Sequence, residues 1–356
     1  MTGPRIGSLT LANPLVLAPM AGLTNWPFRR LAKACGAALT VTEMVSSQSL
    51  SSRGAKTLKL LKTDPRIEKP FCVQLFGKDP VLMAQAARIA EDLGADIIDL
   101  NLACPARKVI RSGHGAALLK DFPLAFKLVR AAAEAVRIPV TVKTRPRFGP
   151  GFPDIFQLAP LLAEAGAAAV TVHGREAVQG FAGEADWEIV RRLAAECPIP
   201  VFGSGDLVTP EDIVRKLRDI KCAGVFIGRG AKGRPWIFRQ ALELLAGRRP
   251  AKVTLEERFL TARTHAQWLQ EEIGNRAAFM LRSVLMWYTK YLPQAAAIRR
   301  AICLEENIGR QLAILEEGFQ AALDQGAGDD LFDGEDQPEG REPAEELEPF
   351  PAEDRA

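Results

Sequence analysis

The chain of 356 residues has few of the residues that mark metal, disulfide or membrane proteins. Its six cysteines form no Cys-x-x-Cys pair, and its three histidines are not spaced as ligands, which argues against a disulfide framework, a zinc site or an iron–sulfur cluster. It has no apolar run of about 18 residues, so we expect no transmembrane helix. The first residues carry no apolar signal segment. We therefore expect a cytoplasmic protein without metal or membrane contact.

Two motifs of common enzyme classes are also absent. No Gly-x-Ser-x-Gly sequence occurs, which disfavours a Ser/His/Asp hydrolase. No Gly-x-Gly-x-x-Gly follows the first apolar run, which weakens the case for a dinucleotide-binding open sheet.

The net charge of +3 hides an uneven distribution of charge along the chain. Residues 327–356 contain 12 acidic and 2 basic residues, so the remaining 326 residues carry a net charge of +13. A basic body favours a polyanionic partner, although a Lys- and Arg-rich soluble surface explains the charge equally well. The acidic segment has little apolar content, and we predict that it is a disordered tail.

Eight apolar runs recur with helix-like segments between them. They span residues 15–19, 38–44, 71–76, 96–101, 140–145, 169–173, 200–203 and 224–228. The runs are continuously apolar, as strands are when helices cover both faces of their sheet. Eight such strands within about 230 residues predict an α/β fold of the (β/α)₈ TIM-barrel type, with a doubly wound open sheet as the alternative.

The pattern changes near Thr254. From there the sequence predicts only helices, over Leu255–Ile273, Asn275–Tyr291 and Ala295–Asp324, the last with possible breaks. We therefore predict a barrel in residues 1–248, a small all-helical C-terminal domain in 249–326 and the acidic tail in 327–356.

The segment Asp99–Ala116 is the most informative part of the sequence. It follows a strand-like run and places Asn101, Cys104, Arg107 and Lys108 where the polar chemistry of α/β folds gathers. A cysteine beside a proline, with two cations and a Gly-rich turn nearby, is atypical of a core residue. We interpret it as a positioned acid or nucleophile close to a polyanion.

Two Gly-rich turns follow the seventh and eighth runs, Gly203-Ser-Gly-Asp206 and Gly228-Arg-Gly230. Barrels commonly bind a phosphate at these two positions, so a phosphorylated cofactor such as flavin mononucleotide (FMN) fits. Lys143 is expected to lie beside the pyrimidine edge of a flavin, and Gln74 to bond the same edge. His173 is expected to contact cofactor or substrate.

Cations alternate with aromatic residues in the middle of the helical region. Arg282, Lys290 and Arg299 suit phosphate contact, and Tyr288 and Trp287 suit base stacking. For Trp287 and Tyr288, packing between helices is the simpler interpretation.

Taken together, these motifs resemble the tRNA-dihydrouridine synthase family over roughly residues 5–310, with the bacterial B-type branch most similar. The resemblance rests on Ala18-Pro-Met-Ala-Gly-Leu-Thr24, Gln74, Asn101-Leu-Ala-Cys-Pro-Ala-Arg-Lys-Val109, Gly113-x-Gly115, Lys143-Thr-Arg145, Val172-His-Gly-Arg175 with Gln179, Gly205-Asp206 and Gly228-Arg-Gly-Ala-x-Gly-Arg-Pro-Trp-Ile-Phe238.

The resemblance implies an FMN-dependent oxidoreductase that reduces uridines of tRNA to 5,6-dihydrouridine with NADPH, or NADH, as reductant. It implies that Cys104 protonates C5 as a general acid after hydride reaches C6. We expect a monomer with tRNA as partner. FMN would be bound by Pro19, Met20, Ala21, Gln74, Lys143, His173, Ser204, Gly205, Asp206, Gly228 and Arg229. Substrate would be bound by Asn101, Arg107, Lys108, Arg145, Arg175, Arg282, Tyr288, Lys290 and Arg299.

The chain departs from the family pattern at two places. Ser204 stands where an asparagine is usual, and the stretch Arg282–Tyr288 lacks a usual Lys and His. Two other functions stay open: a flavin barrel acting on a free pyrimidine, similar to dihydroorotate dehydrogenases, and an RNA-binding module without catalysis. The basic body argues against the first, and the presence of Cys104 and Lys143 argues against the second.

Overall fold

Eight parallel strands close into a barrel, and each predicted apolar run supplies one of them. The structure, a computed structural model, describes residues 3–325, so the predicted acidic tail lies outside the described residues. The barrel strands are β3 (Leu15–Leu17), β4 (Leu39–Val41), β6 (Phe71–Phe76), β7 (Ile97–Leu102), β8 (Val140–Thr144), β9 (Ala167–His173), β10 (Val201–Ser204) and β11 (Gly224–Ile227). Since β4 pairs with both β3 and β6, the sheet is closed. The predicted TIM barrel is confirmed, and the open-sheet alternative is wrong.

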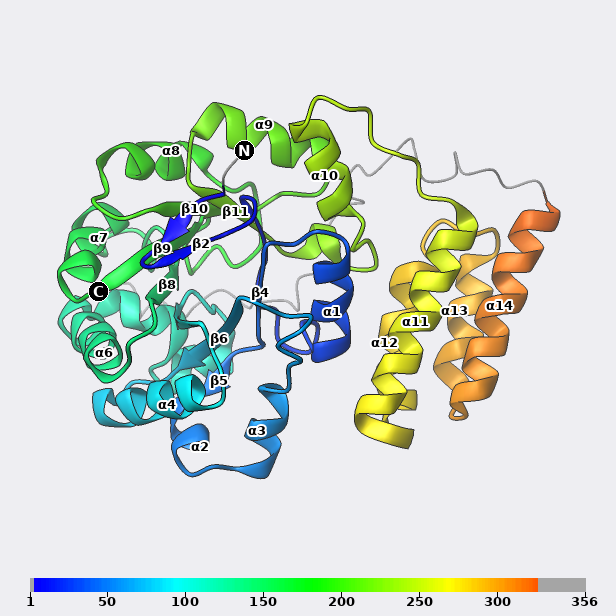
Figure 1. Cartoon of the computed structure of the whole chain (residues 1–356), viewed down its shortest axis with the longest axis horizontal. Coiled ribbons are helices and arrows are strands. Elements are labelled where there is room, and N and C mark those ends of the chain that lie inside the picture. Colours follow the sequence, from blue (N-terminus) through cyan, green and yellow to red (C-terminus); the bar gives the residue numbers. More distant parts are fainter. Residues whose placement is uncertain (1–2, 326–356) are drawn as a thin grey trace.

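Helices surround the barrel and cover the apolar side chains that the strands present on their outer face (Figure 1). The outer helices are α1 (Trp26–Ala34), α4 (Pro80–Asp92), α6 (Phe122–Ala135), α7 (Ile155–Glu164), α8 (Trp187–Glu196), α9 (Pro210–Ile220) and α10 (Ile237–Leu245). Most begin at a side chain that accepts hydrogen bonds from the first free backbone N–H groups, such as Asp79 at α4 and Thr209 at α9.

Several short elements were not predicted from the sequence. Strand β5 (Val45–Ser46) extends the pairing with β6, and α2 (Ser47–Ser51), α3 (Ala55–Leu60) and α5 (Arg107–Arg111) lie in loops after strands. A hairpin of β1 (Arg5–Ile6) and β2 (Leu9–Thr10) precedes the barrel.

The hairpin covers the amino end of the barrel. Ile6 and Leu11 are buried in one apolar cluster with Val16, Phe202 and Phe226. Because the amino end is sealed by apolar side chains, polar side chains from the strands can gather only towards the carboxyl end.

Four helices pack into a bundle beside the barrel (Figure 1): α11 (Leu255–Ile273), α12 (Ala277–Tyr288), α13 (Ala295–Leu304) and α14 (Ile308–Asp324). The predicted segment 295–324 is thus two helices, separated at Glu305–Asn307, where Asn307 caps α14. Among residues 3–325, no helix has both the length and the apolar character needed to cross a membrane.

The bundle contacts the barrel through α1 and through the loops after β3 and β11. The ring of Phe28 in α1 lies 5.7 Å from that of His265 and 5.9 Å from that of Trp287. Gly233, after β11, lies so close to the backbone of Trp287 that a Cβ there would come within 2.7 Å of the Trp287 carbonyl oxygen. The bundle therefore stands next to the carboxyl-end rim.

Candidate active site

The strand residues predicted for the site meet at the carboxyl end of the barrel. We call this end the barrel mouth; it comprises the last residues of β6 to β11 and the loops that follow β3 and β6 to β11. Gln74, Asn101, Lys143 and His173 come from the neighbouring strands β6, β7, β8 and β9. Gln74, Asn101 and Lys143 are buried. Asn101 and Lys143 are register partners, so their side chains share the interior face.

A chain of hydrogen bonds joins three of these strands. Thr141 Oγ1 and Gln74 Nε2 each donate to the carboxylate of Asp99 at 2.7 Å. Asn101 Nδ2 donates to Gln74 Oε1 at 2.8 Å, and Asn101 Oδ1 accepts from the backbone N–H of Cys104 at 2.9 Å. The loop that carries Cys104 is thereby fixed to the barrel interior.

The loop after β7 is also closed from its far side. Cys104 is half-buried, and its carbonyl accepts a hydrogen bond from the N–H of Ala116 at 3.1 Å. Gly115 has φ of +59°, and a Cβ at this position would lie 2.9 Å from the Cys104 carbonyl oxygen. The Gly113-x-Gly115 motif is therefore a geometric requirement for placing Cys104.

Lys143 and Arg145 bring two cations into the same small volume. Burial and the neighbouring Arg145 lower the pKa of Lys143 to about 8, while Asp99 acts in the opposite direction. The guanidinium of Arg145 donates to the backbone carbonyls of Ala103, Glu176 and Gly180 at 2.8–2.9 Å. Arg145 is 2% exposed, so its visible role is to tie the loop after β7 to the loop after β9.

His173 ends β9 with one ring nitrogen unused. Burial, followed by the surrounding cations, holds its pKa well below the usual range, so the ring is neutral at pH 7. Its Nδ1 is buried without a hydrogen-bond partner. The ring of Phe181, half exposed in the following loop, lies 6.2 Å from that of His173. The guanidinium carbons of Arg145 and Arg229 lie 5.5 and 5.1 Å from the Phe181 ring centroid.

Arg175 and Asp206 form a fixed ion pair between the loops after β9 and β10. Arg175 Nη2 lies 2.8 Å from both carboxylate oxygens, and the Ala185 N–H donates to the same carboxylate at 2.7 Å. Arg175 Nη1 is buried without a partner. Asp206 has φ of +51°, and Gly205 before it has φ of +119°. The turn after β10 thus contains two residues at positive φ, and the side chain of Asp206 fixes it to the loop after β9.

The remaining residues predicted for the cofactor lie in the turns beside this pair. Ser204 ends β10 and donates its hydroxyl to the Phe226 carbonyl at 3.1 Å. A Cβ on Gly228 would lie 3.6 Å from Met20 Sδ, so the turns after β3 and β11 adjoin. These turns carry Pro19, Met20, Ala21, Gly228 and Arg229.

The mouth combines strong positive charge with unused polar groups. Four cationic side chains, Lys143, Arg145, Arg175 and Arg229, surround His173 closely enough to depress its pKa. A phosphorylated ligand with hydrogen-bonding groups on a ring suits such a set, because anions stabilise buried cations and ring atoms can pair the orphaned nitrogens. Over the described residues, no group of three or more His, Cys, Asp and Glu side chains is placed to hold a metal ion.

The two cations after Cys104 lie on the short helix α5. Lys108 is exposed and Arg107 is half-exposed. Both follow the mouth loop directly, so a polyanion over the mouth would come within reach of their side chains.

The predicted RNA-contacting residues of the bundle are placed in two ways. Arg282, Lys290 and Arg299 are half-exposed, with Arg299 Nε donating to Thr289 Oγ1 at 3.3 Å. Tyr288 is 0% exposed, and its hydroxyl lies 3.0 Å from His265 Nδ1 inside the bundle. The ring of Tyr288 is therefore used for packing in this structure, and its contact with substrate stays a prediction.

Three residues in or directly beneath the mouth were missed by sequence reasoning: Asp99 and Thr141 inside the barrel and Phe181 in the loop after β9. Asp99 carried a usable signal, because an acid in the middle of an otherwise apolar strand must be paired when buried. Phe181 carried none, since one aromatic residue in a Gly-rich loop indicates neither packing nor binding.

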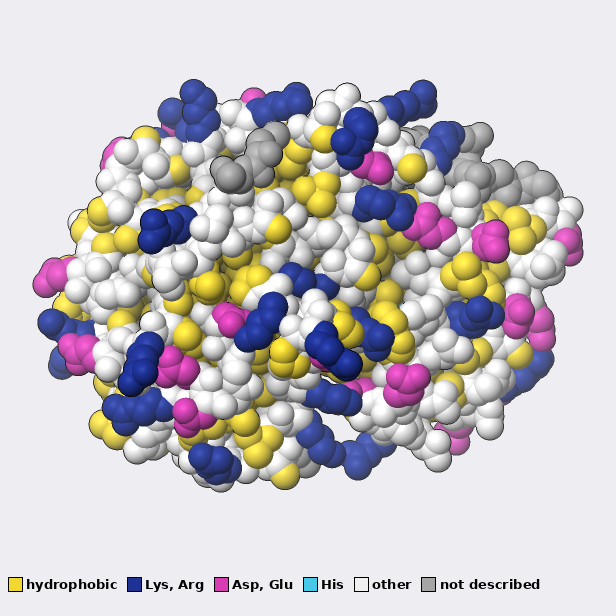
Figure 2. Space-filling view, viewed as in Figure 1, with side chains coloured by type: hydrophobic (Ala, Val, Ile, Leu, Met, Phe, Trp, Pro, Cys, Tyr) yellow, Lys and Arg dark blue, Asp and Glu magenta, His cyan; other side chains and the backbone are white. Residues whose placement is uncertain are grey.

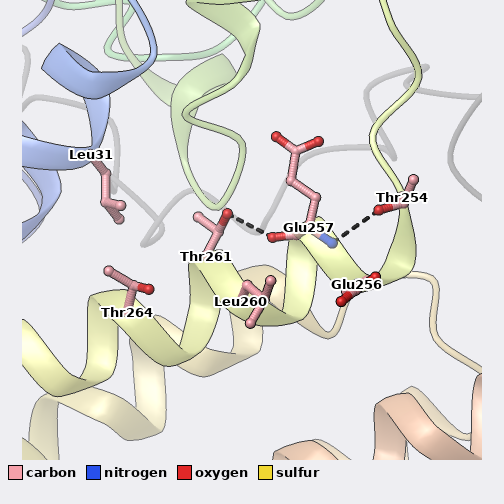
Figure 3. A pocket seen from close by; sticks show the side chains of 7 residues that line it. All are labelled: Leu31, Thr254, Glu256, Glu257, Leu260, Thr261 and Thr264. Atoms are coloured by element: carbon pink, nitrogen blue, oxygen red, sulfur yellow. Dashed lines mark hydrogen bonds between the residues drawn. The ribbon is translucent and has the colours of Figure 1, made fainter.

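Two surface features lie apart from the mouth. On the face drawn in Figure 2, Lys and Arg side chains are dispersed among acidic and apolar ones, not gathered in one block. A groove of about 350 Å³ runs between Leu31 of α1 and the start of α11 (Figure 3). Its Thr254 and Thr261 hydroxyls bond the α11 backbone at Glu257, so they serve that helix.

Comparison with known proteins identifies the family. The family model described as dihydrouridine synthase (Dus) matches residues 16–324. The chain is 37% identical over 306 residues to a probable tRNA-dihydrouridine synthase of Rickettsia bellii, covering 84% of this chain and 93% of that protein. It is 39% identical over 326 residues to tRNA-dihydrouridine synthase B of Pseudomonas syringae pv. tomato, covering 90% and 95%.

Solved structures support the fold independently. Histamine dehydrogenase from Rhizobium sp. 4-9 matches with a TM-score of 0.52 at 14% identity, covering 68% of this chain and 47% of that chain. A 2-naphthoyl-CoA reductase matches with a TM-score of 0.54 at 10% identity, covering 68% and 51%. Together with the match to the family model and the identity to its curated relatives, the barrel and its mouth lead to one conclusion: the chain belongs to the dihydrouridine synthase family.

Proposed function

We propose that this chain reduces uridine in tRNA to 5,6-dihydrouridine, with FMN as its bound flavin and NADPH, or NADH, as the reductant. The observation that supports the proposal is the attachment of the Cys104 loop to Asn101, which is the direct register partner of the buried cation Lys143 on the neighbouring strand. This arrangement puts a proton donor and a cation at one barrel opening, as a reduction that adds hydride and proton to a base requires.

The residues of the mouth fit FMN. The turns at Ser204–Asp206 and Gly228–Arg229 would hold its phosphate, where backbone N–H groups and Arg229 are available. The unpartnered His173 Nδ1 is a further polar atom for the cofactor. Gln74 and Lys143 would contact the flavin ring, and Pro19, Met20 and Ala21 would lie against it.

When bound and reduced by NADPH, FMN supplies the hydride that uridine C6 receives. Cys104 donates its thiol proton to C5, and the thiolate is then reprotonated from solvent, so one hydride and one proton are added across the C5–C6 bond. Lys143 would stabilise negative charge on the flavin ring beside its ammonium group. Asn101 and Arg175 orient the base, while Arg145 keeps the loops that carry Cys104 and Arg175 in register.

The tRNA must present a base turned out of its stack for it to enter the barrel. We propose that Arg107 and Lys108 on α5 contact its phosphates at the mouth, and that Arg282, Lys290 and Arg299 do so on the bundle, residues 249–326. The position of the bundle beside the mouth, next to the loops after β3 and β11, supports a shared binding surface.

Mass spectrometry of tRNA transcribed without modifications tests the proposal. The tRNA is incubated with purified protein, FMN and NADPH, beside parallel reactions with free uracil and with dihydroorotate. We expect dihydrouridine in the tRNA alone. Turnover confined to the free pyrimidines would replace the proposal with a metabolic flavoenzyme, and absence of FMN binding would leave only an RNA-binding role.

A further inference from the structure

Asp99 is the buried acid of the barrel that the proposed chemistry does not use. It lies in the middle of β7, is 1% exposed, and faces the interior between β6 and β8. Burial raises the pKa of its carboxyl, and hydrogen bonds from Gln74 and Thr141 and the charge of Lys143 act against this. A buried carboxyl with two short hydrogen bonds is costly to build, which indicates a defined task.

The polarity of the hydrogen-bond chain through Asp99 is fixed at its other end. Asn101 Oδ1 accepts from the backbone N–H groups of Ala103 at 3.0 Å and Cys104 at 2.9 Å. Backbone N–H groups can only donate, so Asn101 must turn its Nδ2 towards Gln74. Gln74 then presents its oxygen to Asn101 and needs an acceptor for its Nε2, which Asp99 provides at 2.7 Å.

We propose that Asp99 is a positioning residue: its carboxylate fixes the Gln74 amide in the one orientation that pairs with Asn101, and so anchors, from the strand end, the hydrogen-bond chain that holds the loop of Cys104. The part that concerns the flavin rests on the proposed function. Without the carboxylate, Gln74 has no buried acceptor for Nε2, and its amide is free to rotate. Asn101 then loses the partner that keeps its Oδ1 on the Cys104 loop.

Four variants separate this role from simple packing. Asp99→Leu removes the acceptor and keeps the volume. Asp99→Asn keeps an amide oxygen that accepts from Gln74 Nε2, and its amide nitrogen can donate to Thr141 Oγ1. Gln74→Leu removes the residue through which Asp99 is proposed to act. Thr141→Val is the matched control, because it removes the other hydrogen bond to Asp99 and leaves Gln74 paired. Thermal unfolding verifies that each variant folds.

The first readout is the dissociation constant of FMN. We expect Asp99→Leu and Gln74→Leu each to weaken FMN binding about 10-fold, as the loss of one buried hydrogen bond does. The double variant should bind FMN no more weakly than Gln74→Leu alone, and Asp99→Asn and Thr141→Val should bind like the wild type. Additive losses in the double variant would overturn the proposal, because Asp99 would then act independently of Gln74.

The second readout does not depend on the proposed function. Iodoacetamide alkylation of Cys104 is followed by peptide mass spectrometry in the flavin-free protein, with the half-buried Cys303 of the bundle as internal reference. We expect Asp99→Leu to alkylate severalfold faster than the wild type and Asp99→Asn at the wild-type rate. Equal alkylation rates of Cys104 in all variants would overturn the proposal that Asp99 holds the Cys104 loop in place. If the wild type binds no FMN, the proposed function fails while this comparison still decides the role of Asp99.

Discussion

The barrel mouth and the helical bundle use polar residues in opposite ways. In the mouth, Gln74, Asp99 and Asn101 point inward, are buried, and are joined to one another. In the bundle, the cations Lys290 and Arg299 are half-exposed, and Tyr288, the aromatic residue predicted to contact substrate, is buried. The mouth is therefore built for a fixed geometry, whereas the bundle presents cations that solvent partly reaches.

This difference matches the two tasks we propose. Proton and hydride transfer to one base require groups held to within fractions of an ångström, which buried hydrogen bonds provide. Attraction of a polyanion requires only charge at roughly the right place, because phosphate contacts act through space and tolerate flexible side chains. The following predictions test that division of labour.

The largest effect is expected for the thiol. Cys104→Ala should lower dihydrouridine formation by about 1,000-fold, since general-acid catalysis contributes 10²- to 10⁴-fold. The FMN dissociation constant and the unfolding midpoint should stay at wild-type values. Cys303→Ala, which changes a half-buried cysteine of the bundle, is the control and should retain the rate. Near-normal activity of Cys104→Ala would remove this thiol from the acid role.

Removal of the buried cation should stabilise the flavin-free protein. Burial lowers the pKa of Lys143 to about 8 in the folded protein, against 10.5 for a free lysine side chain. Lys143→Met should therefore raise the free energy of unfolding at pH 7, by less than the roughly 3 kcal/mol to which this difference corresponds, because Asp99 loses its neighbouring positive charge. Between these two pKa values the unfolded chain binds one more proton than the folded protein, so the free energy of unfolding of the wild type rises with pH in this range. The stabilisation of the variant relative to the wild type that comes from this charge therefore disappears by about pH 10.5. Denaturant titrations at several pH values measure this difference. A constant difference would contradict the burial of a charged Lys143.

Charge removal from the bundle should affect affinity and leave chemistry intact. Lys290→Ala with Arg299→Ala should weaken tRNA binding about 10-fold and reduce the slope of log K against log salt by roughly 2, one per lost phosphate contact. The matched control removes the exposed cations Lys127 and Arg218 from the outer barrel helices α6 and α9. An equal loss in the control would mean that net charge, not the bundle, attracts the tRNA.

The smallest effect is expected for the buried tyrosine. Tyr288→Phe removes the hydroxyl that lies 3.0 Å from His265 and should cost about 1 kcal/mol of unfolding free energy. Affinity for tRNA should be unchanged, because no part of the ring is exposed. A drop in tRNA affinity with unchanged stability would return Tyr288 to the binding surface.

The difference between barrel mouth and bundle also explains which features could be predicted from the sequence. The strand Phe71–Phe76 was predictable to the residue, and the other barrel strands to within three residues at each end, because short continuously apolar runs between helical segments are typical of strands covered on both faces. Alternation along a strand then fixes which side chains face the interior, so Gln74, Asn101 and Lys143 could be placed at one opening before the fold was known. The family resemblance added the role of Cys104.

Other features depend on contacts that a single segment does not encode. The hairpin Arg5–Thr10 has only two residues in each strand, and the break at Glu305–Asn307 depends on a cap within an otherwise helical pattern. The choice between packing and substrate contact for Tyr288 could not be made from the sequence, because the direction of a helical side chain depends on how the helices rotate against each other. Phe181 became visible only when the folded loop brought it over His173.

The central claim, chemistry in the mouth and attraction on the bundle, is tested most directly by one rate. Dihydrouridine formed in a single turnover at saturating tRNA is measured by mass spectrometry for Cys104→Ala and for the Lys290 and Arg299 double variant. The account predicts a rate about 1,000-fold lower for the first and a wild-type rate for the second. A comparable loss of rate in the bundle variant, with tRNA saturating, would contradict it.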